Sequence, residues 1–176
     1  MRLIVVNGYA RAGKDTFINI CRDIIGKKYS MKISIIDPVK DIAKYCGWDG
    51  IKTDKSRKFL CDLKDLLSEW NDVPFMKICT KIDEFQWDME HYGVSDNAYV
   101  FVIMREKSDT DRLVERYKCE CTNVYKVFIN GGERNTSNRA DIGVVNEGYD
   151  FTIDNDSSIS DLEKKAKNFI NSIKGD

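Results

Sequence analysis

Gly8, Gly13 and Lys14, in the segment VNGYARAGKDTF, have the spacing of a phosphate-binding loop. Glycines in such a loop let backbone N–H groups face phosphate oxygens, and the lysine ammonium reaches the outer phosphates. The hydroxyl residue that normally follows the lysine and holds Mg²⁺ is replaced here by Asp15, and Thr16 comes one place later. Thr16 is therefore the expected metal ligand. Asp15 either approaches the metal or occupies the first turn of a helix, where negative charge is favourable.

The segments on both sides of this loop meet the structural requirement of the motif. The apolar, β-branched run 3–7 is typical of a buried strand, and residues 14–27 place their apolar side chains on one side of a helix. A helix that starts at the loop turns its positive end toward the phosphates. The alternative is a glycine-rich turn with a surface lysine. We expect nucleotide phosphates to bind through Gly8, Ala10, Arg11, Ala12, Gly13, Lys14, Asp15 and Thr16.

Length and composition indicate one globular domain without a nucleic-acid or membrane partner. The chain has 176 residues, 42% of them hydrophobic, and 28 Lys plus Arg nearly balance 29 Asp plus Glu. Nucleic-acid binding through phosphate contacts needs a basic excess that this chain lacks. The longest apolar run, AYVFVIM, is too short to span a bilayer. The absence of a secretory signal pattern at the start favours a cytoplasmic protein with mostly reduced cysteines.

Apolar runs and helical stripes alternate along the chain. The expected strands are 3–7, 31–37, 98–104, 124–129 and 149–154, and helices are expected at 14–27, from Pro38 on, and at 55–70, 74–89, 108–118 and 159–173. This alternation predicts a parallel sheet covered on both faces. Residues 38–92 are too long for a simple crossover, so we expect a helical insertion beside the substrate site. The polar loop 130–148 is a candidate lid, because structureless loops of this length are uncommon without a function.

Five blocks, spread over most of the chain, carry a family resemblance: LIVVNGYARAGKDTF, DPVKDIAKYCGWDGIK, DKSRKFLCDLKDLL, FVIMREKSDTDRL and VVNEGYDFTIDNDSSISDLEKKAKNFI. The first resembles the opening of the phage-type deoxynucleoside monophosphate kinases and their bacterial relatives, in which GKDT is typical. The other blocks are similar to later segments of small P-loop kinases of this type. The resemblance implies a three-layer α/β/α P-loop fold with the parallel strand order 2-3-1-4-5. It also implies ATP and Mg²⁺ as phosphoryl donor and a monophosphate as acceptor.

Three basic residues are candidates for stabilising the transferred phosphoryl group. Phosphoryl transfer depends on positioning and positive charge more than on covalent chemistry, and arginine can bind two phosphate oxygens at once. Lys14 is the first candidate. Arg11 lies inside the loop, where the alternative is a solvated turn residue. Arg105 follows the third expected strand, and ligands of open α/β sheets bind outside the carboxyl ends of the strands.

Four further residues are candidates for binding the acceptor. Arg57 stands near the start of an apolar helical stripe and is the expected acceptor clamp, with a plain surface charge as the alternative. Arg134 and Arg139 lie in the expected lid and could close over the phosphates. Asp37 ends the second expected strand, which the implied order separates from the phosphate loop. It is therefore expected on the acceptor side, or as a cap of the helix that follows.

The acid that would complete a Mg²⁺ site is not evident. The strand expected beside the loop ends in Met104-Arg105-Glu106, which places an acid one residue late. Three functions therefore stay open: an ATP-dependent kinase of a (deoxy)nucleoside monophosphate, a kinase with a non-nucleotide acceptor, and a nucleotide-binding protein without an acceptor. The first implies a small nucleotide substrate as partner. The sequence leaves open whether the chain forms a homodimer.

Overall fold

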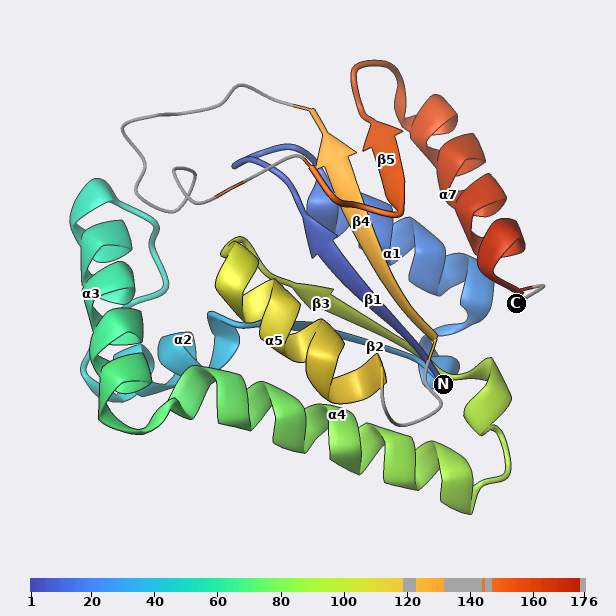
Figure 1. Cartoon of the computed structure of the whole chain (residues 1–176). Helices are drawn as coiled ribbons and strands as arrows, with labels where there is room; N and C mark the ends of the chain where they lie inside the picture. The colour runs from blue at the N-terminus through green and yellow to red at the C-terminus, as the bar shows by residue number, and fades with distance from the viewer. Residues whose placement is uncertain (119–122, 132–143, 145–146, 175–176) are drawn as a thin grey trace.

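Five parallel strands form a single sheet in the order β2-β3-β1-β4-β5 (Figure 1). The computed structural model describes residues 1–118, 123–131, 144 and 147–174. The strands are β1 (Arg2–Asn7), β2 (Ser30–Ser34), β3 (Tyr99–Ile103), β4 (Asn123–Asn130) and β5 (Phe151–Asp154). The order confirms the predicted α/β P-loop architecture.

Helices cover both faces of this sheet. They are α1 (Lys14–Ile25), α2 (Asp37–Tyr45), α3 (Asp54–Asn71), α4 (Val73–His91), α5 (Lys107–Lys118) and α7 (Ile159–Lys174), with short 3₁₀ turns at Lys27–Tyr29 and Ser95–Asn97. None of these helices is long and apolar enough to cross a membrane. Such two-sided cover explains why β1 and β3, in the middle of the sheet, read as continuous apolar runs rather than as alternating ones.

The central strand β1 divides the core into two clusters. Ile4 and Val6 face α1 and α7, where Phe17 and Phe169 pack together, with ring centroids 5.6 Å apart. On the other face, Leu3 and Val5 join the cluster to which α4 and α5 contribute. Alternate residues of a strand point to opposite faces, so one short run supplies both clusters. The end of β1, and the loop that follows it, is thereby held in the middle of the molecule.

The helices α2 and α3 pack in a third, smaller cluster. Val39 and Ala43 of α2 contact Leu60 of α3, with Trp48 and Leu63 against them. In Figure 1 these two helices lie to one side, past the carboxyl ends of β2 and β3. By contrast, the apolar side chains of α4 join the core beneath the sheet. The α2–α3 pair is therefore the part of the segment between β2 and β3 that stands beside the ligand-binding edge.

The second strand is shorter than the sequence predicts. Residues 31–37 were expected to be extended, but β2 ends at Ser34 and α2 begins at Asp37. The carboxylate of Asp37 accepts a hydrogen bond from the backbone N–H of Ser34 at 2.7 Å, which folds the chain back on itself. Pro38 then occupies the first turn of α2, where its missing N–H costs nothing. The apolar pair Ile35–Ile36 belongs to this turn rather than to the strand.

Candidate functional site

The loop 8–13 joins the end of β1 to the start of α1 and has an unusual backbone. Gly8 (φ +146°), Arg11 (φ +62°) and Gly13 (φ +89°) all have positive φ angles. The N–H of Ala12 donates to the carbonyl of Tyr9 at 3.2 Å, which closes the turn. Alternation of right- and left-handed residues turns successive N–H groups toward one point and forms an anion-binding concavity. This is the geometry that the glycine spacing predicts.

The glycines of the loop have no room for a side chain. A Cβ on Gly8 would lie 2.5 Å from the carbonyl oxygen of Ile129 in β4, and a Cβ on Gly13 would lie 2.2 Å from the Asn155 side chain. Both positions favour glycine for the backbone angle, and Gly8 also needs it because a backbone atom of β4 approaches closely, whereas the end of the Asn155 side chain beside Gly13 can move. The loop is held between the ends of β4 and β5.

Lys14 places its ammonium group inside the loop. The side chain is buried, with 7% of the residue exposed. Its Nζ atom donates to the carbonyl oxygens of Gly8 and Tyr9, at 2.7 and 2.6 Å. The first N–H groups of α1 have no partners within the helix and carry the positive end of its dipole. Positive charge from the lysine and from the helix therefore converges at one place.

Two asparagines support the loop, and sequence reasoning missed both. Asn7 is buried, with its Oδ1 atom accepting from the N–H of Gly8 at 2.7 Å and its Nδ2 atom donating to the carbonyl of Arg105 at 3.1 Å. Asn155 donates from Nδ2 to the carbonyl of Ala12 at 3.0 Å. The sequence carried a signal for Asn7, because it is the polar residue that ends the apolar run 3–7. Asn155 had none, because its partner is 143 residues away in the chain.

Asp15 forms an ion pair with a lysine of a neighbouring strand. Its carboxylate lies 2.6 Å from the Nζ atom of Lys32 in β2, and 72% of its side chain is exposed. Partial burial alone would raise the pKa of Asp15, but the hydrogen bond and charge of Lys32, with the charges of Lys14 and Lys40, bring the pKa below its usual value. Asp15 is thus an anion at neutral pH that links α1 to β2. Thr16, also exposed, offers the hydroxyl of the first turn.

We expect Asp15→Asn to leave phosphoryl transfer nearly unchanged. Exposed ion pairs contribute about 0–1 kcal/mol, so the free energy of unfolding should fall by less than about 1 kcal/mol. Because the folded-state pKa of Asp15 is lowered, this contribution is present above the unfolded-state pKa and disappears as the pH falls through the folded-state value. Chemical denaturation at pH 7 and pH 3 and steady-state rates at varied Mg²⁺ measure both effects.

The control for this substitution is Asp41→Asn, which removes a comparably exposed ion pair with Lys44 in α2, at 3.5 Å. A large loss of rate in Asp15→Asn alone, with a changed Mg²⁺ dependence, would place Asp15 in the metal's coordination shell and contradict the expectation.

Two of the predicted arginines lie at the carboxyl edge of the sheet. Arg11 is exposed in the loop itself. Arg105 follows β3 by two residues, and its backbone is tied to Asn7 and so to the loop. Arg57 is exposed in the first turns of α3, which begins at a capping box formed by Thr53. Arg134 and Arg139, with most of the expected lid, lie outside the described residues.

Two acids at this edge of the sheet, Asp37 and Glu106, are paired with lysines. Asp37 pairs with Lys40 at 2.8 Å while it accepts from Ser34, so it does not cap α2, as one interpretation had expected. Glu106 pairs with Lys64 at 2.6 Å. Within the part of the chain that the structure describes, no three His, Cys, Asp or Glu side chains gather as a metal site. The exposed hydroxyl of Thr16, in the first turn of α1, has the chemistry of a Mg²⁺ ligand.

The sequence matches no protein-family model, and no curated protein is detectably similar to it. Solved structures of similar fold include the Mycobacterium tuberculosis APS kinase in complex with AMPPNP and APS, with a TM-score of 0.51, 10% identity and coverage of 97% of this chain and 95% of that one. A sugar kinase from Janibacter sp. HTCC2649 has a TM-score of 0.47 at 18% identity, covering 97% of this chain and 95% of that one. A gluconokinase from Sinorhizobium meliloti 1021 has 0.44 at 16% identity and 97% coverage of both chains.

At these identities the likeness establishes the fold alone. The first of the three structures, the one with a TM-score above 0.5, supports the P-loop kinase architecture that the strand order already indicates. The chain thus has the fold of P-loop kinases, and its acceptor has to be argued from its own residues.

Proposed function

We propose that this protein transfers the terminal phosphoryl group of ATP to a small monophosphate, specifically a nucleoside or deoxynucleoside monophosphate. One observation carries the proposal: the ammonium of Lys14 is buried inside a loop with three positive φ angles, at the positive end of α1. Such a loop is complementary to the oxygens of a chain of phosphates.

The loop and the start of α1 would hold the donor. Backbone N–H groups of residues 8–13 bind the inner phosphates, and Lys14 moves from the carbonyls of Gly8 and Tyr9 to the outer phosphate oxygens. Thr16 would help to hold Mg²⁺, which supplies positive charge to the phosphates when bound. Arg11, exposed beside them, reaches the transferred group. Positioning of this kind lowers the barrier because the charge that develops meets donors already in place.

The acceptor would bind between the phosphate loop and the α2–α3 pair. Arg105 follows β3 at the edge of the sheet next to the loop, and Arg57 is exposed in the first turns of α3. Two guanidinium groups on different elements suit an acceptor whose phosphate must be held against the repulsion of the donor. Asp37 and Lys40 lie at the β2–α2 turn of the same edge and would contact the rest of the acceptor. Arg134 and Arg139 are proposed to close over the phosphates.

The test is transfer from γ-labelled ATP and Mg²⁺ to a panel of ribo- and deoxyribonucleoside monophosphates, with phosphorylated sugars, free sugars and water as further acceptors. The expected product is a labelled nucleoside diphosphate from one or a few acceptors. Label found only in a sugar product would show that the acceptor is a sugar and not a nucleotide. Label found only in free phosphate would leave a nucleotide-binding protein without an acceptor and overturn the proposal.

A further inference from the structure

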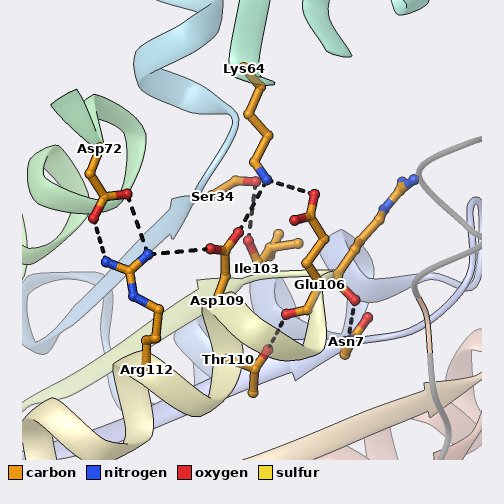
Figure 2. Close-up of polar contacts among 10 residues, drawn as sticks. Asn7, Ser34, Lys64, Asp72, Ile103, Glu106, Asp109, Thr110 and Arg112 are labelled. Atoms are coloured by element: carbon orange, nitrogen blue, oxygen red, sulfur yellow. Dashed lines mark hydrogen bonds and ion pairs between the residues drawn. The ribbon is translucent and has the colours of Figure 1, made fainter. Parts of the chain in front are cut away.

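Lys64 of α3 lies in a cluster of charges between α3 and the start of α5 (Figure 2). Its Nζ atom is 2.6 Å from Glu106 Oε1 and 3.1 Å from Asp109 Oδ2. Only 12% of the Lys64 side chain and 14% of the Asp109 side chain are exposed. Sequence reasoning missed the cluster because its partners are 42 and 45 residues away in the chain.

Because Lys64 and Asp109 are largely buried, each of these charges needs its partner. Burial alone would lower the pKa of Lys64, but the hydrogen bonds and charges of Glu106 and Asp109 raise the pKa above its usual value. The lysine is thus charged at neutral pH. A partly buried charge that loses its partner costs far more than an exposed one, because water cannot fully replace the partner. These ion pairs therefore tie the middle of α3 to the start of α5.

A second contact extends the cluster to the end of α3. Arg112 of α5 forms an ion pair with Asp72, which lies between α3 and α4, and its other nitrogen is 4.0 Å from Asp109 (Figure 2). Its guanidinium group also lies over the Phe75 ring, 4.0 Å from the centroid. Both the middle and the carboxyl end of α3 are thus tied to the same turns of α5.

A short series of contacts joins this cluster to the phosphate loop. Glu106 is bonded covalently to Arg105, whose carbonyl accepts from Asn7 at 3.1 Å. Asn7 in turn accepts from the N–H of Gly8, the first residue of the loop, at 2.7 Å. The carbonyl of Glu106 accepts from the hydroxyl of Thr110 at 3.1 Å, which steadies the same corner. The corner that Lys64 contacts is therefore tied to the loop through Arg105 and Asn7, by hydrogen bonds that do not involve α3.

The same face of α3 carries Arg57. Seven residues separate Arg57 from Lys64, which is close to two turns, so their side chains leave the helix in nearly the same direction, about 10 Å apart along the axis. Because Lys64 contacts the β3–α5 corner, this face is the one turned to the carboxyl edge of the sheet. The direction of Arg57 thus depends on the ion pairs of Lys64.

We propose that Lys64 is a positioning residue for the acceptor: by pairing with Glu106 and Asp109, it holds the Arg57 face of α3 against the corner that carries Arg105 and supports the phosphate loop. This inference rests on the proposed function for the identity of the acceptor. It assigns to Lys64 no contact with substrate. It predicts that acceptor binding and donor binding respond differently when the pairing is lost.

The test compares Lys64→Met with Lys64→Arg and with Lys58→Met. Methionine keeps the length of the side chain but not the charge, and arginine keeps the charge. Lys58 is on α3 too, pairs with Asp62 and is largely exposed, so its substitution controls for loss of charge from the helix. Hydrogen bonds to charged groups at this depth correspond to about tenfold or more in affinity, so we expect Lys64→Met to raise the KM for the acceptor about tenfold. The KM for ATP should stay unchanged, and Lys64→Arg should recover most of the loss.

The outcomes separate this inference from the proposed function. An equal rise of both KM values, or no rescue by arginine, would show that Lys64 contributes only to the general stability of the fold. Either result would overturn the positioning role. If the wild type phosphorylates no acceptor, the proposed function fails. Amide hydrogen exchange of α3 then tests whether Lys64 holds this helix in place. Exchange across Asp54–Asn71 should then be faster in Lys64→Met than in Lys58→Met, with α1 unchanged. Equal exchange in the two variants would contradict the inference.

Discussion

Lys14→Ala is expected to lower kcat/KM for phosphoryl transfer at least about a hundredfold, the usual effect of removing one preorganised charge-stabilising donor. The ammonium of Lys14 is inside the loop, within hydrogen-bonding distance of two carbonyl oxygens that phosphate oxygens can replace. Alanine removes this charge from the place where negative charge develops during transfer. The main core should remain folded, because Lys14 lies at its edge and the apolar residues of α1 are untouched.

Rates and nucleotide affinity together measure this effect. The matched control is Lys27→Ala, which removes a lysine beyond the opposite end of α1, where 71% of the side chain is exposed and paired with Asp23. We expect the control to transfer phosphate at the wild-type rate. Thermal unfolding of both variants shows whether the loss arises from the site or from the fold. A Lys14→Ala variant with near wild-type kcat/KM would refute the assignment of this loop to the donor.

The second large effect is expected for Gly8→Ala. The new Cβ would lie 2.5 Å from the carbonyl oxygen of Ile129, a backbone atom of β4 that cannot rotate away, and the φ angle of +146° is strained for any L residue. Backbone strain and overpacking each cost about 1–3 kcal/mol, so the free energy of unfolding should fall by about 3 kcal/mol. Part of this cost can be relieved only by moving the loop off β4, which also removes its anion-binding shape.

Gly47→Ala is the control for the backbone angle. Gly47 follows α2 with a φ angle of +90°, and a Cβ there would meet nothing within 4 Å. The Gly47→Ala substitution should lower the free energy of unfolding only by the left-handed backbone strain, about 1–2 kcal/mol, and leave nucleotide binding intact. Urea unfolding and the affinity for a non-hydrolysable ATP analogue are measured for both variants. The comparison separates the effect of backbone strain from that of the steric clash with β4. Wild-type affinity for the analogue in Gly8→Ala would show that the loop is not the phosphate site.

Several features were predictable because their causes are local. The run 3–7 has no polar residue before Asn7, so it forms the buried strand β1, and the glycines that follow allow the positive φ angles of the loop. The helix α1 ends at Ile25, and Gly26 follows it with a φ angle of +100°, which glycine adopts without strain. The strand order 2-3-1-4-5 was inferred from family resemblance rather than from periodicity, and the structure confirms it.

Other features were decided only when distant segments met. The end of β2 was misplaced because the bond from Ser34 to Asp37 competes with strand extension, and local hydrophobicity does not show that competition. The role of Asp15 depends on Lys32 in a separate strand.

The sequence by itself determined the phosphate loop, because glycine spacing, the lysine and the flanking elements lie within one short segment. The tertiary structure decided what supports that loop and what faces it. Asn155 reaches Ala12 only after β5 has joined β4, and Lys64 reaches Glu106 only after α3 has packed beside the sheet. Side-chain pairs of this kind depend on how whole elements pack, and neighbouring residues in the chain carry no signal of them.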